Sequence, residues 1–319
     1  MSYHTPQKII GILLAGAMLL PLLAGCTPSA EKHATQVGIS SEGQALSKDP
    51  TQLLPEEPEP LPHEEPDTPA DDAPAPDDAP ADDTPAAPVE SAMTQLQQSV
   101  QAMVNSYSGV WSVYVKRLDT GESFAINDSS MVAASLIKLY VYGAIGQAEE
   151  SGQIASGSYD NTLSSMITVS DNDACNLLID VLGKEAINQF IQNQGYWQTA
   201  LNRKMLSGEP VENYTSVSEC GRLLEQVYTG SFVSARVSSS LLTALQNQTR
   251  RWKIPAGLPG GTLCANKTGE LSDVENDVAI VYGPSCTYIL CVMSDGVAPG
   301  TAQVNIQNIS AAVYSALNG

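Results

Sequence analysis

The sequence predicts an α+β fold, an α/β sandwich in which one antiparallel sheet of about five strands is flanked by helices. The prediction rests on the order of two patterns within residues 91–319. Short stretches of strand-like composition occur near both ends of this region, and helical periodicity dominates between them. Because strands from the two ends can pair, we expect the middle helices to form a reduced, all-helical subdomain beside the sheet. A cleft is expected where the two parts meet.

Each element follows from a local pattern of residues. Met93, Leu96, Val100, Met103 and Tyr107 recur at intervals of three or four, which is typical of an amphipathic helix. Later elements are assigned in the same way from periodicity, strand composition and turn residues. The expected order is a helix over 93–107, strands over 110–116 and 122–126 joined by a turn at 119–121, helices over 134–150, 173–182, 216–228 and 237–246, strands over 262–268, 277–282 and 287–293, and a helix over 304–317.

The first 26 residues have the composition of an export signal. Lys8 precedes an apolar run of about 15 residues, and small residues lead to Cys26. This boundary resembles a bacterial lipobox, in which Cys26 is lipidated and becomes the mature N-terminus. The alternatives are an ordinary signal peptide or a membrane span with an unrelated cysteine, although the run is short for a span. We expect an extracytoplasmic protein that is anchored to the bacterial cell membrane by lipid at Cys26.

Residues 27–90 are predicted to be a disordered spacer that precedes the folded domain at 91–319. Between Pro55 and Glu90 the chain has 11 prolines and 13 acidic residues, with no lysine or arginine. Proline-rich sequence with charges of one sign cannot bury a core and stays extended.

The formal net charge of −20 belongs mostly to this spacer. Residues 27–90 hold 16 acidic residues against two lysines, whereas residues 91–319 hold 19 acidic residues against 12 basic ones. No basic stripe is present in the folded part, so nucleic-acid binding is not expected.

The chain has six cysteines. If Cys26 is lipidated, an odd number remains, so at least one thiol is free or paired with another molecule. Histidine is absent from residue 64 onwards and no C-x-x-C spacing occurs, so we expect no metal site and no cofactor. The sequence leaves open how the others pair: Cys175, Cys220, Cys264, Cys286 and Cys291.

Three short motifs follow one another along the folded region. They are Ser135-x-x-Lys138, the triplet at 170–172 (Ser-Asp-Asn) and the triplet at 267–269 (Lys-Thr-Gly). A serine nucleophile needs a base, which is usually histidine. Here the nearest candidate is Lys138, one helical turn after Ser135, and a desolvated lysine loses its proton readily.

Each motif alone has an ordinary structural explanation. Serine and lysine suit a surface helix, the Ser-Asp-Asn triplet suits a helix N-cap, and Lys-Thr-Gly suits a turn at a strand end. In one chain and in this order, the three motifs together indicate serine acyl transfer assisted by lysine.

The set resembles the signature of class A β-lactamases and penicillin-binding proteins. The similarity extends through residues 166–178, Pro255-Ala256-Gly257 and residues 276–279, and it covers essentially all of residues 91–319. It implies a fold like that of β-lactamases and D,D-peptidases. It also implies a serine hydrolase that opens β-lactam or D-alanyl amides and makes residues 91–319 the catalytic domain.

The resemblance implies four catalytic residues. Ser135 is the nucleophile, and Lys138 helps to deprotonate it. Ser170 passes the proton to the leaving nitrogen. Lys267 receives the carboxylate of the substrate.

The resemblance also implies a substrate-binding set. Asn172 holds the side-chain amide of the substrate, and Thr268 shares the carboxylate with the preceding lysine. Gly269 allows close approach of another chain segment. The backbone N–H of Glu270, with that of the nucleophile, forms an oxyanion hole, while Asp171 braces its loop.

The chain departs from the lactamase pattern at the glutamate that activates the deacylating water. One alignment, which starts from the Thr-Ala-Leu-Asn-Arg segment at 199–203, places Met205 at this position, and methionine cannot act as a base. A second alignment uses the similarity of residues 209–213 to the family's E-P-x-L-N and makes Glu209 the candidate deacylation base. We prefer the first, because Gly208 and residues 213–216 look like the exit of the loop into the next helix. Both alternatives remain open at this point.

Two further departures are visible. The distance from Ser135 to Ser170 is shorter than in typical class A enzymes, so part of the helical subdomain is expected to be missing. Glu275 occurs where many lactamases have an arginine that assists the substrate carboxylate, and Arg250 or Arg251 are candidates to replace it.

The expected function is a class A β-lactamase-like serine hydrolase that works through an acyl-enzyme at Ser135. One alternative is a penicillin-binding, D,D-peptidase-like protein, because loss of a general base slows the step it serves by about a hundred- to ten-thousand-fold. A non-catalytic penicillin sensor is another. The expected partners are a β-lactam or a cell-wall peptide and the membrane, and we expect a monomer.

Overall fold

The computed structural model describes residues 91–319. The predicted signal peptide, the lipidation of Cys26 and the predicted spacer over 27–90 lie outside the described residues.

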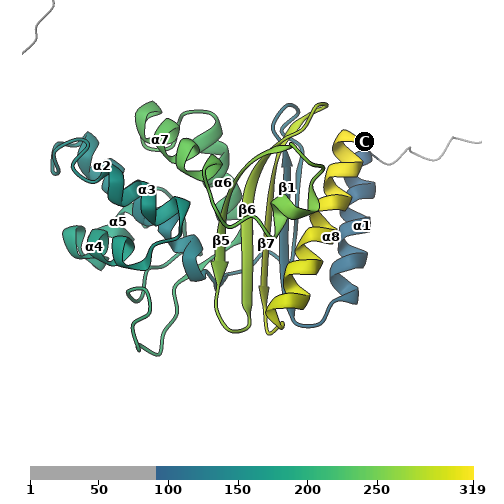
Figure 1. Cartoon of the computed structure of the whole chain (residues 1–319), viewed down its shortest axis with the longest axis horizontal. Helices are drawn as coiled ribbons and strands as arrows, with labels where there is room; N and C mark the ends of the chain where they lie inside the picture. The colour runs from purple at the N-terminus through teal and green to yellow at the C-terminus, as the bar shows by residue number, and fades with distance from the viewer. Residues whose placement is uncertain (1–90) are drawn as a thin grey trace, which may run out of the picture. The chain divides into compact units, whose positions relative to one another are not determined.

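A five-stranded antiparallel sheet forms the centre of the domain (Figure 1). Its strand order is β2-β1-β7-β6-β5, so strands from both ends of the domain meet at the β1–β7 pair, where Val113 lies opposite Val292. This confirms the predicted sheet. The strands are β1 (Val110–Arg117), β2 (Ser123–Ile126), β5 (Leu263–Glu270), β6 (Val274–Tyr282) and β7 (Thr287–Asp295).

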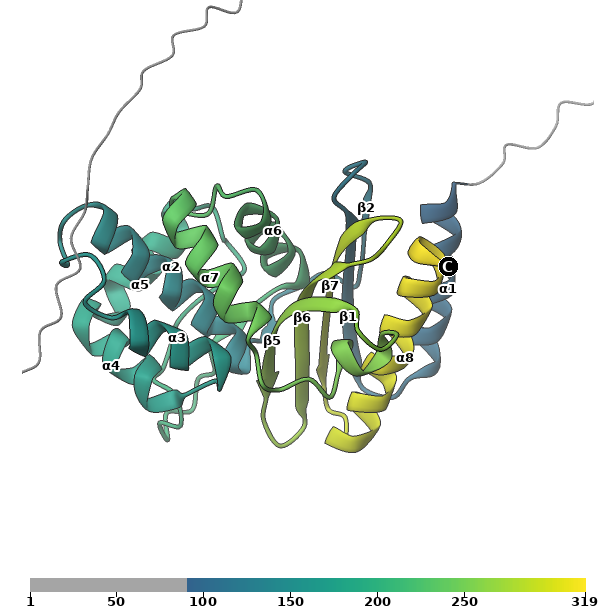
Figure 2. The same cartoon turned by 45° about the horizontal axis from the view of Figure 1, so that its top comes forward.

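Two helices, α1 (Ala92–Ser106) and α8 (Pro299–Asn318), cover one face of the sheet (Figures 1 and 2). Alternate side chains of a strand point to opposite faces. Leu290 and Val292 of β7 therefore enter the core beneath these helices, whereas Ile289 and Cys291 enter the core on the other face. The sheet is buried on both sides, which explains why β7 is almost continuously apolar from Tyr288 to Met293.

The second face contacts α6 (Val217–Tyr228), beyond which lies a helical lobe (Figure 2). None of the helices within residues 91–319 is long and apolar enough to cross a membrane. The lobe consists of α2 (Ile137–Glu150), α3 (Asp160–Thr168), α4 (Asn172–Leu182), α5 (Lys184–Asn193) and α7 (Ala235–Gln246). Short elements complete the fold: β3 (Met131–Val132), β4 (Tyr214–Thr215) and the 3₁₀ turns Ala134–Leu136 and Ile254–Gly257.

Two helices of the lobe, α3 and α5, were not predicted. Helix α3 has only nine residues, several of them serine or threonine, which have weak helix propensity. Helix α5 buries Ile187, Phe190 and Ile191, and their helical spacing is a signal that was available in the sequence. The predicted helix over 134–150 also starts differently, because Ser135 lies on a 3₁₀ turn before α2.

Candidate active site

The turn that carries Ser135 is strained and is held by the sheet. Ala134 has a φ of 46°, in the left-handed region that residues other than glycine rarely adopt. The side-chain amide of Asn276, in β6, donates hydrogen bonds to the carbonyls of Val132 at 2.9 Å and Ala133 at 3.3 Å. Strained backbone persists only where its surroundings hold it, and these bonds supply that support next to the nucleophile.

Lys138 follows Ser135 by one turn, and its side chain is fully buried. Its Nζ donates to the Ser170 carbonyl at 2.7 Å, to Ser170 Oγ at 3.2 Å and to Asn172 Oδ1 at 2.7 Å. Burial lowers the pKa of Lys138 to about 8, because desolvation penalises the charged amine. Within the described part of the chain, no hydrogen bond joins this amine to Ser135 Oγ. Catalytic hydrogen bonds often tighten only around the substrate.

Ser170 lies between two lysines. Its Oγ accepts a hydrogen bond from Lys267 Nζ at 2.9 Å in addition to the bond from Lys138. Its φ of 60° is again in the left-handed region. The next residue, Asp171, caps α4 by accepting hydrogen bonds from two backbone N–H groups of the first turn at 2.9 and 3.1 Å. As expected, the aspartate braces the segment that positions the serine.

Lys267 projects from β5 and is fully buried. Besides Ser170, its Nζ contacts the Thr268 carbonyl at 2.7 Å. Its pKa is well below the ordinary value, first because of burial and then because of the positive charges of Lys138 and Arg250. Two amines of lowered pKa therefore flank one hydroxyl, which is an arrangement that can move a proton at neutral pH.

Gly269 allows the end of β5 to run beside the Ser135 turn. A Cβ atom at this glycine would lie 2.7 Å from the carbonyl oxygen of Ala133 and 3.2 Å from the backbone nitrogen of Ser135. The predicted close approach is therefore present. It brings the backbone N–H of Ser135 near the strand end at Glu270, where the oxyanion hole was expected.

A small cavity of about 50 Å³ opens beside the nucleophile. It brings Ser135, Asn172 and Glu270 of the predicted site together with the loop over 203–213. Among its walls are Ser135, Asn172, Met205, Leu206, Glu212 and Glu270.

The structure distinguishes the two candidate positions for a deacylating base. Met205 is 8% exposed, and Asn176 of α4 fixes its backbone by accepting from its N–H at 2.8 Å and donating to its carbonyl at 3.0 Å. The carboxylate of Glu209 is 49% exposed, pairs with Lys184 at 3.6 Å and does not line the cavity. The geometry favours the Met205 alignment and gives no support to Glu209 as the base.

Sequence reasoning missed the residues that close the neck of this loop. Arg203 forms a two-pronged ion pair with Glu212, with bonds of 2.7–3.0 Å. The side chain of Asn213 accepts from the backbone N–H groups of Asn202 at 2.8 Å and Arg203 at 2.9 Å. Opposite charges at the two ends of a loop were the available signal.

An ion network lies behind the end of β5. Lys253 is fully buried and contacts Glu275 at 2.5 Å and Glu270 at 3.2 Å. Glu270 also pairs closely with Arg250, whereas Arg251 bonds to a carbonyl of β5. Of the two candidate arginines, Arg250 is therefore the one beside the cavity.

The five cysteines of residues 91–319 are all buried free thiols. The same region contains no group of three histidine, cysteine or acidic side chains that could hold a metal ion.

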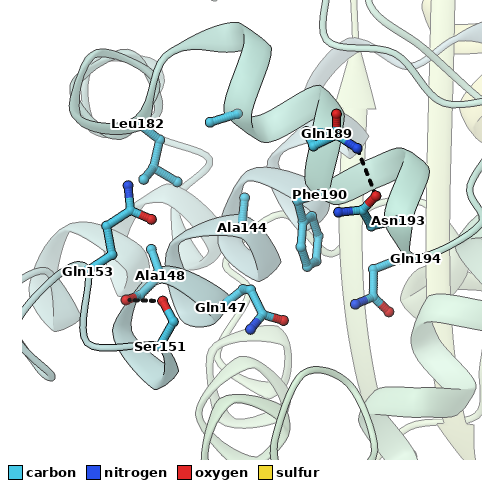
Figure 3. A pocket seen from close by; sticks show the side chains of 11 residues that line it. Ala144, Gln147, Ala148, Ser151, Gln153, Leu182, Gln189, Phe190, Asn193 and Gln194 are labelled. Atoms are coloured by element: carbon cyan, nitrogen blue, oxygen red, sulfur yellow. Dashed lines mark hydrogen bonds between the residues drawn. The ribbon is translucent and has the colours of Figure 1, made fainter.

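A separate hollow of about 260 Å³ lies in the helical lobe between α2 and α5 (Figure 3). Amide side chains such as Gln147 and Asn193 surround an apolar floor that includes Phe190. No lysine, histidine or carboxylate lines it, so Ser151 has no base there and the hollow is not a candidate for acyl transfer.

The fold and the site define a class: a serine–lysine acyl-transfer enzyme with its nucleophile between a helical lobe and an antiparallel sheet. The profile of the β-lactamase enzyme family matches residues 95–158 and 157–317, and the chain belongs to that family. It is accordingly a serine hydrolase of the β-lactamase type.

Solved structures with the same fold include several members of this class. PBP-A is 27% identical, with a TM-score of 0.65 over 70% of this chain and 96% of that chain. A β-lactamase from Sphaerobacter thermophilus is 23% identical, with a TM-score of 0.64 over 70% and 97% of the two chains. The extended-spectrum β-lactamase TLA-1 is 17% identical, with a TM-score of 0.66 over 72% and 100%. Among curated proteins, none matches the chain.

Proposed function

We propose that Ser135 opens β-lactam or related D-alanyl amides to form an acyl-enzyme, and that this acyl-enzyme is released slowly. The protein would then behave as a penicillin-binding, peptidase-like enzyme. One observation carries the proposal: Met205 lines the cavity beside Ser135, where a base would be needed to activate water.

The acylation step uses the two buried amines. Neutral Lys138 accepts the proton of Ser135 Oγ as the oxygen attacks the carbonyl carbon of the substrate. The C–N bond then breaks, and the proton passes through Ser170 Oγ to the leaving nitrogen. The hydrogen bonds from Lys138 and Lys267 to Ser170 Oγ support this relay.

The proposed binding contacts surround this relay. The Oδ1 atom of Asn172 accepts from Lys138, which leaves its Nδ2 to donate to the side-chain carbonyl of the substrate. Lys267 and Thr268 receive the carboxylate, with Arg250 adding positive charge. The N–H groups of Ser135 and Glu270 stabilise the oxyanion.

Deacylation lacks comparable help. Both carboxylates in the cavity wall are paired, Glu212 with Arg203 and Glu270 with Arg250. Their oxygens already accept from guanidinium N–H groups, so neither carboxylate is free to orient a water molecule in place of the missing glutamate. A relative supports the covalent step: a mutant of PBP-A, 26% identical to this chain, has been solved as an acyl-enzyme complex with penicillin G.

Met205→Glu tests the proposal directly. It should raise the deacylation rate by about a hundred-fold or more, because it adds a general base beside the acyl group. Met205→Gln is the matched control, because it has similar size and no basicity. Release of a chromogenic cephalosporin product measures turnover, and intact mass measures the acyl adduct.

Ser135→Ala should form no adduct. If the natural chain forms no adduct at Ser135 either, the acyl-transfer function is refuted. Cleavage of a D-alanyl peptide would favour the peptidase over a protein that is only acylated once as a sensor.

We also propose that the domain acts outside the cytoplasm, tethered by lipid at Cys26. The support is the signal-like composition of residues 1–26. A cell-wall peptide or an incoming β-lactam is accessible at that location.

A further inference from the structure

The loop over 203–213 presents one large apolar side chain next to the nucleophile. Leu206 is 77% exposed and lines the same cavity as Ser135. Its φ is 58°, in the left-handed region that glycine and asparagine adopt readily and that strains leucine. A strained and solvent-exposed leucine adds nothing to folding stability, so its position points to binding.

The loop segment that carries Leu206 is fixed by hydrogen bonds and an ion pair. The preceding residue, Met205, is fixed through both its backbone N–H and its carbonyl by Asn176. The neck of the loop is closed by the ion pair between Arg203 and Glu212. The backbone that carries Leu206 is therefore held at a defined place beside the cavity.

Every charged side chain that lines the cavity is already part of an ion pair, so none is available to a ligand. The charged side chains in the cavity wall are Arg203, Glu212 and Glu270, and each has an ion-pair partner. The cavity is also lined by the apolar side chains of Met205, Leu206 and Leu271 and by the uncharged amides of Asn172 and Asn213. A charged substituent would lose water here without gaining a counter-ion.

The cavity is too small to enclose a substrate. Its volume of about 50 Å³ is far below the roughly 300–1,000 Å³ of typical small-molecule sites. Most of a bound molecule must therefore lie against the rim, where Leu206 projects.

We propose that Leu206 determines specificity by selecting acyl donors whose side chain is neutral and apolar. This inference rests on the proposed function, which places the substrate carboxylate at Lys267 and the acyl side chain near Asn172. The contact between Leu206 and that side chain forms before acylation, so it affects the efficiency of adduct formation.

Two penicillins that differ by one carboxylate test this inference. Benzylpenicillin has a phenylacetyl side chain, and carbenicillin has the same side chain with an added carboxylate. The second-order rate constant for acylation of Ser135 is measured for both on the full chain by intact mass. Benzylpenicillin should react about tenfold faster, as expected for a well-placed apolar contact.

Leu206→Asn should reduce this ratio at least about fivefold, because it removes the apolar contact while suiting the backbone conformation. Leu206→Gly is a second variant that also relieves the strain. Val211→Asn is the matched control, since Val211 is exposed in the same loop and does not line the cavity.

A ratio that is the same in Leu206→Asn and Leu206→Gly as in the natural chain overturns the inference, as does equal reactivity of the two penicillins in the natural chain. Acylation by neither penicillin overturns the proposed function itself, and with it the inference.

Discussion

In the proposed mechanism, two buried lysines replace the imidazole that serine enzymes usually need. The buried side chains of Lys138 and Lys267 both approach Ser170 Oγ. Desolvation costs a charged amine more than a neutral one, so each amine releases its proton more easily than a surface lysine. In the proposed mechanism, the same burial provides both the base and the proton relay.

The pH dependence of acylation should follow Lys138. Its neutral form is active, and with a pKa of about 8 the neutral fraction rises about tenfold between pH 7 and pH 9. The second-order rate constant for acylation by benzylpenicillin, corrected for spontaneous hydrolysis, should rise accordingly. Lys138→Ala should lose most of the rate, whereas Lys184→Ala, at a surface ion pair, should keep the natural profile. A rate that falls over this interval would contradict the assigned base.

At the scale of elements, the site is the meeting point of one strand end and one helix start. The end of β5 passes so close to the Ser135 turn that only glycine fits at position 269. Asn276, in β6, ties the same turn to the sheet from the other side. The relative position of strand and turn therefore determines the geometry of the proposed oxyanion hole.

Gly269→Ala should therefore reduce acylation by about a hundred-fold, because displacing reacting groups by about 1 Å has an effect of that size. The added Cβ meets backbone atoms, which cannot rotate away. Gly260→Ala is the control, since its Cβ would meet nothing within 4 Å. Rates of adduct formation and thermal unfolding midpoints measure both variants. An unchanged rate in Gly269→Ala would show that the close approach is not needed.

The elements also show which parts of the site could be predicted. Ser135, Lys138 and Ser170 were found because three short motifs occur in one order in the chain, although each motif alone has an ordinary structural explanation. Asn176 and Asn276 were missed, because an amide that binds backbone across the fold has no local signature.

The choice between Met205 and Glu209 as the position of the deacylating base also depends on contacts that the sequence does not show. Sequence spacing offered both Met205 and Glu209 as the position for the base. Only the three-dimensional arrangement places the first beside Ser135 and the second against Lys184.

At the scale of the whole molecule, the sheet unites residues that are far apart in the chain. An antiparallel sheet in which the two ends of the domain meet was inferred from strand-like composition at both ends, and the structure shows that β1 and β7 make that contact. Helix α3 was not predicted, because a short polar helix depends on packing against neighbours more than on its own propensity. Helix α5 was overlooked although the spacing of its buried apolar residues was visible in the sequence. The sequence thus predicted the fold class better than it predicted the individual helices of the helical lobe.

The lipid anchor is a prediction about the whole chain. Cys26→Ser should move the protein from the membrane fraction to the soluble extracytoplasmic fraction, because the lipid attachment site is lost. Fractionation with immunodetection measures this, and Ser29→Ala nearby is the control. A Cys26→Ser protein that stays with the membrane would contradict the lipoprotein assignment.

The central claim is that Ser135 is acylated readily and released slowly. The most direct measurement is the lifetime of the benzylpenicillin adduct on the natural chain, followed by intact mass after removal of free penicillin. The account predicts an adduct at Ser135 that outlasts its formation by at least about a hundred-fold, and a much shorter lifetime in Met205→Glu. An adduct of the natural chain that disappears as fast as it forms would contradict the account.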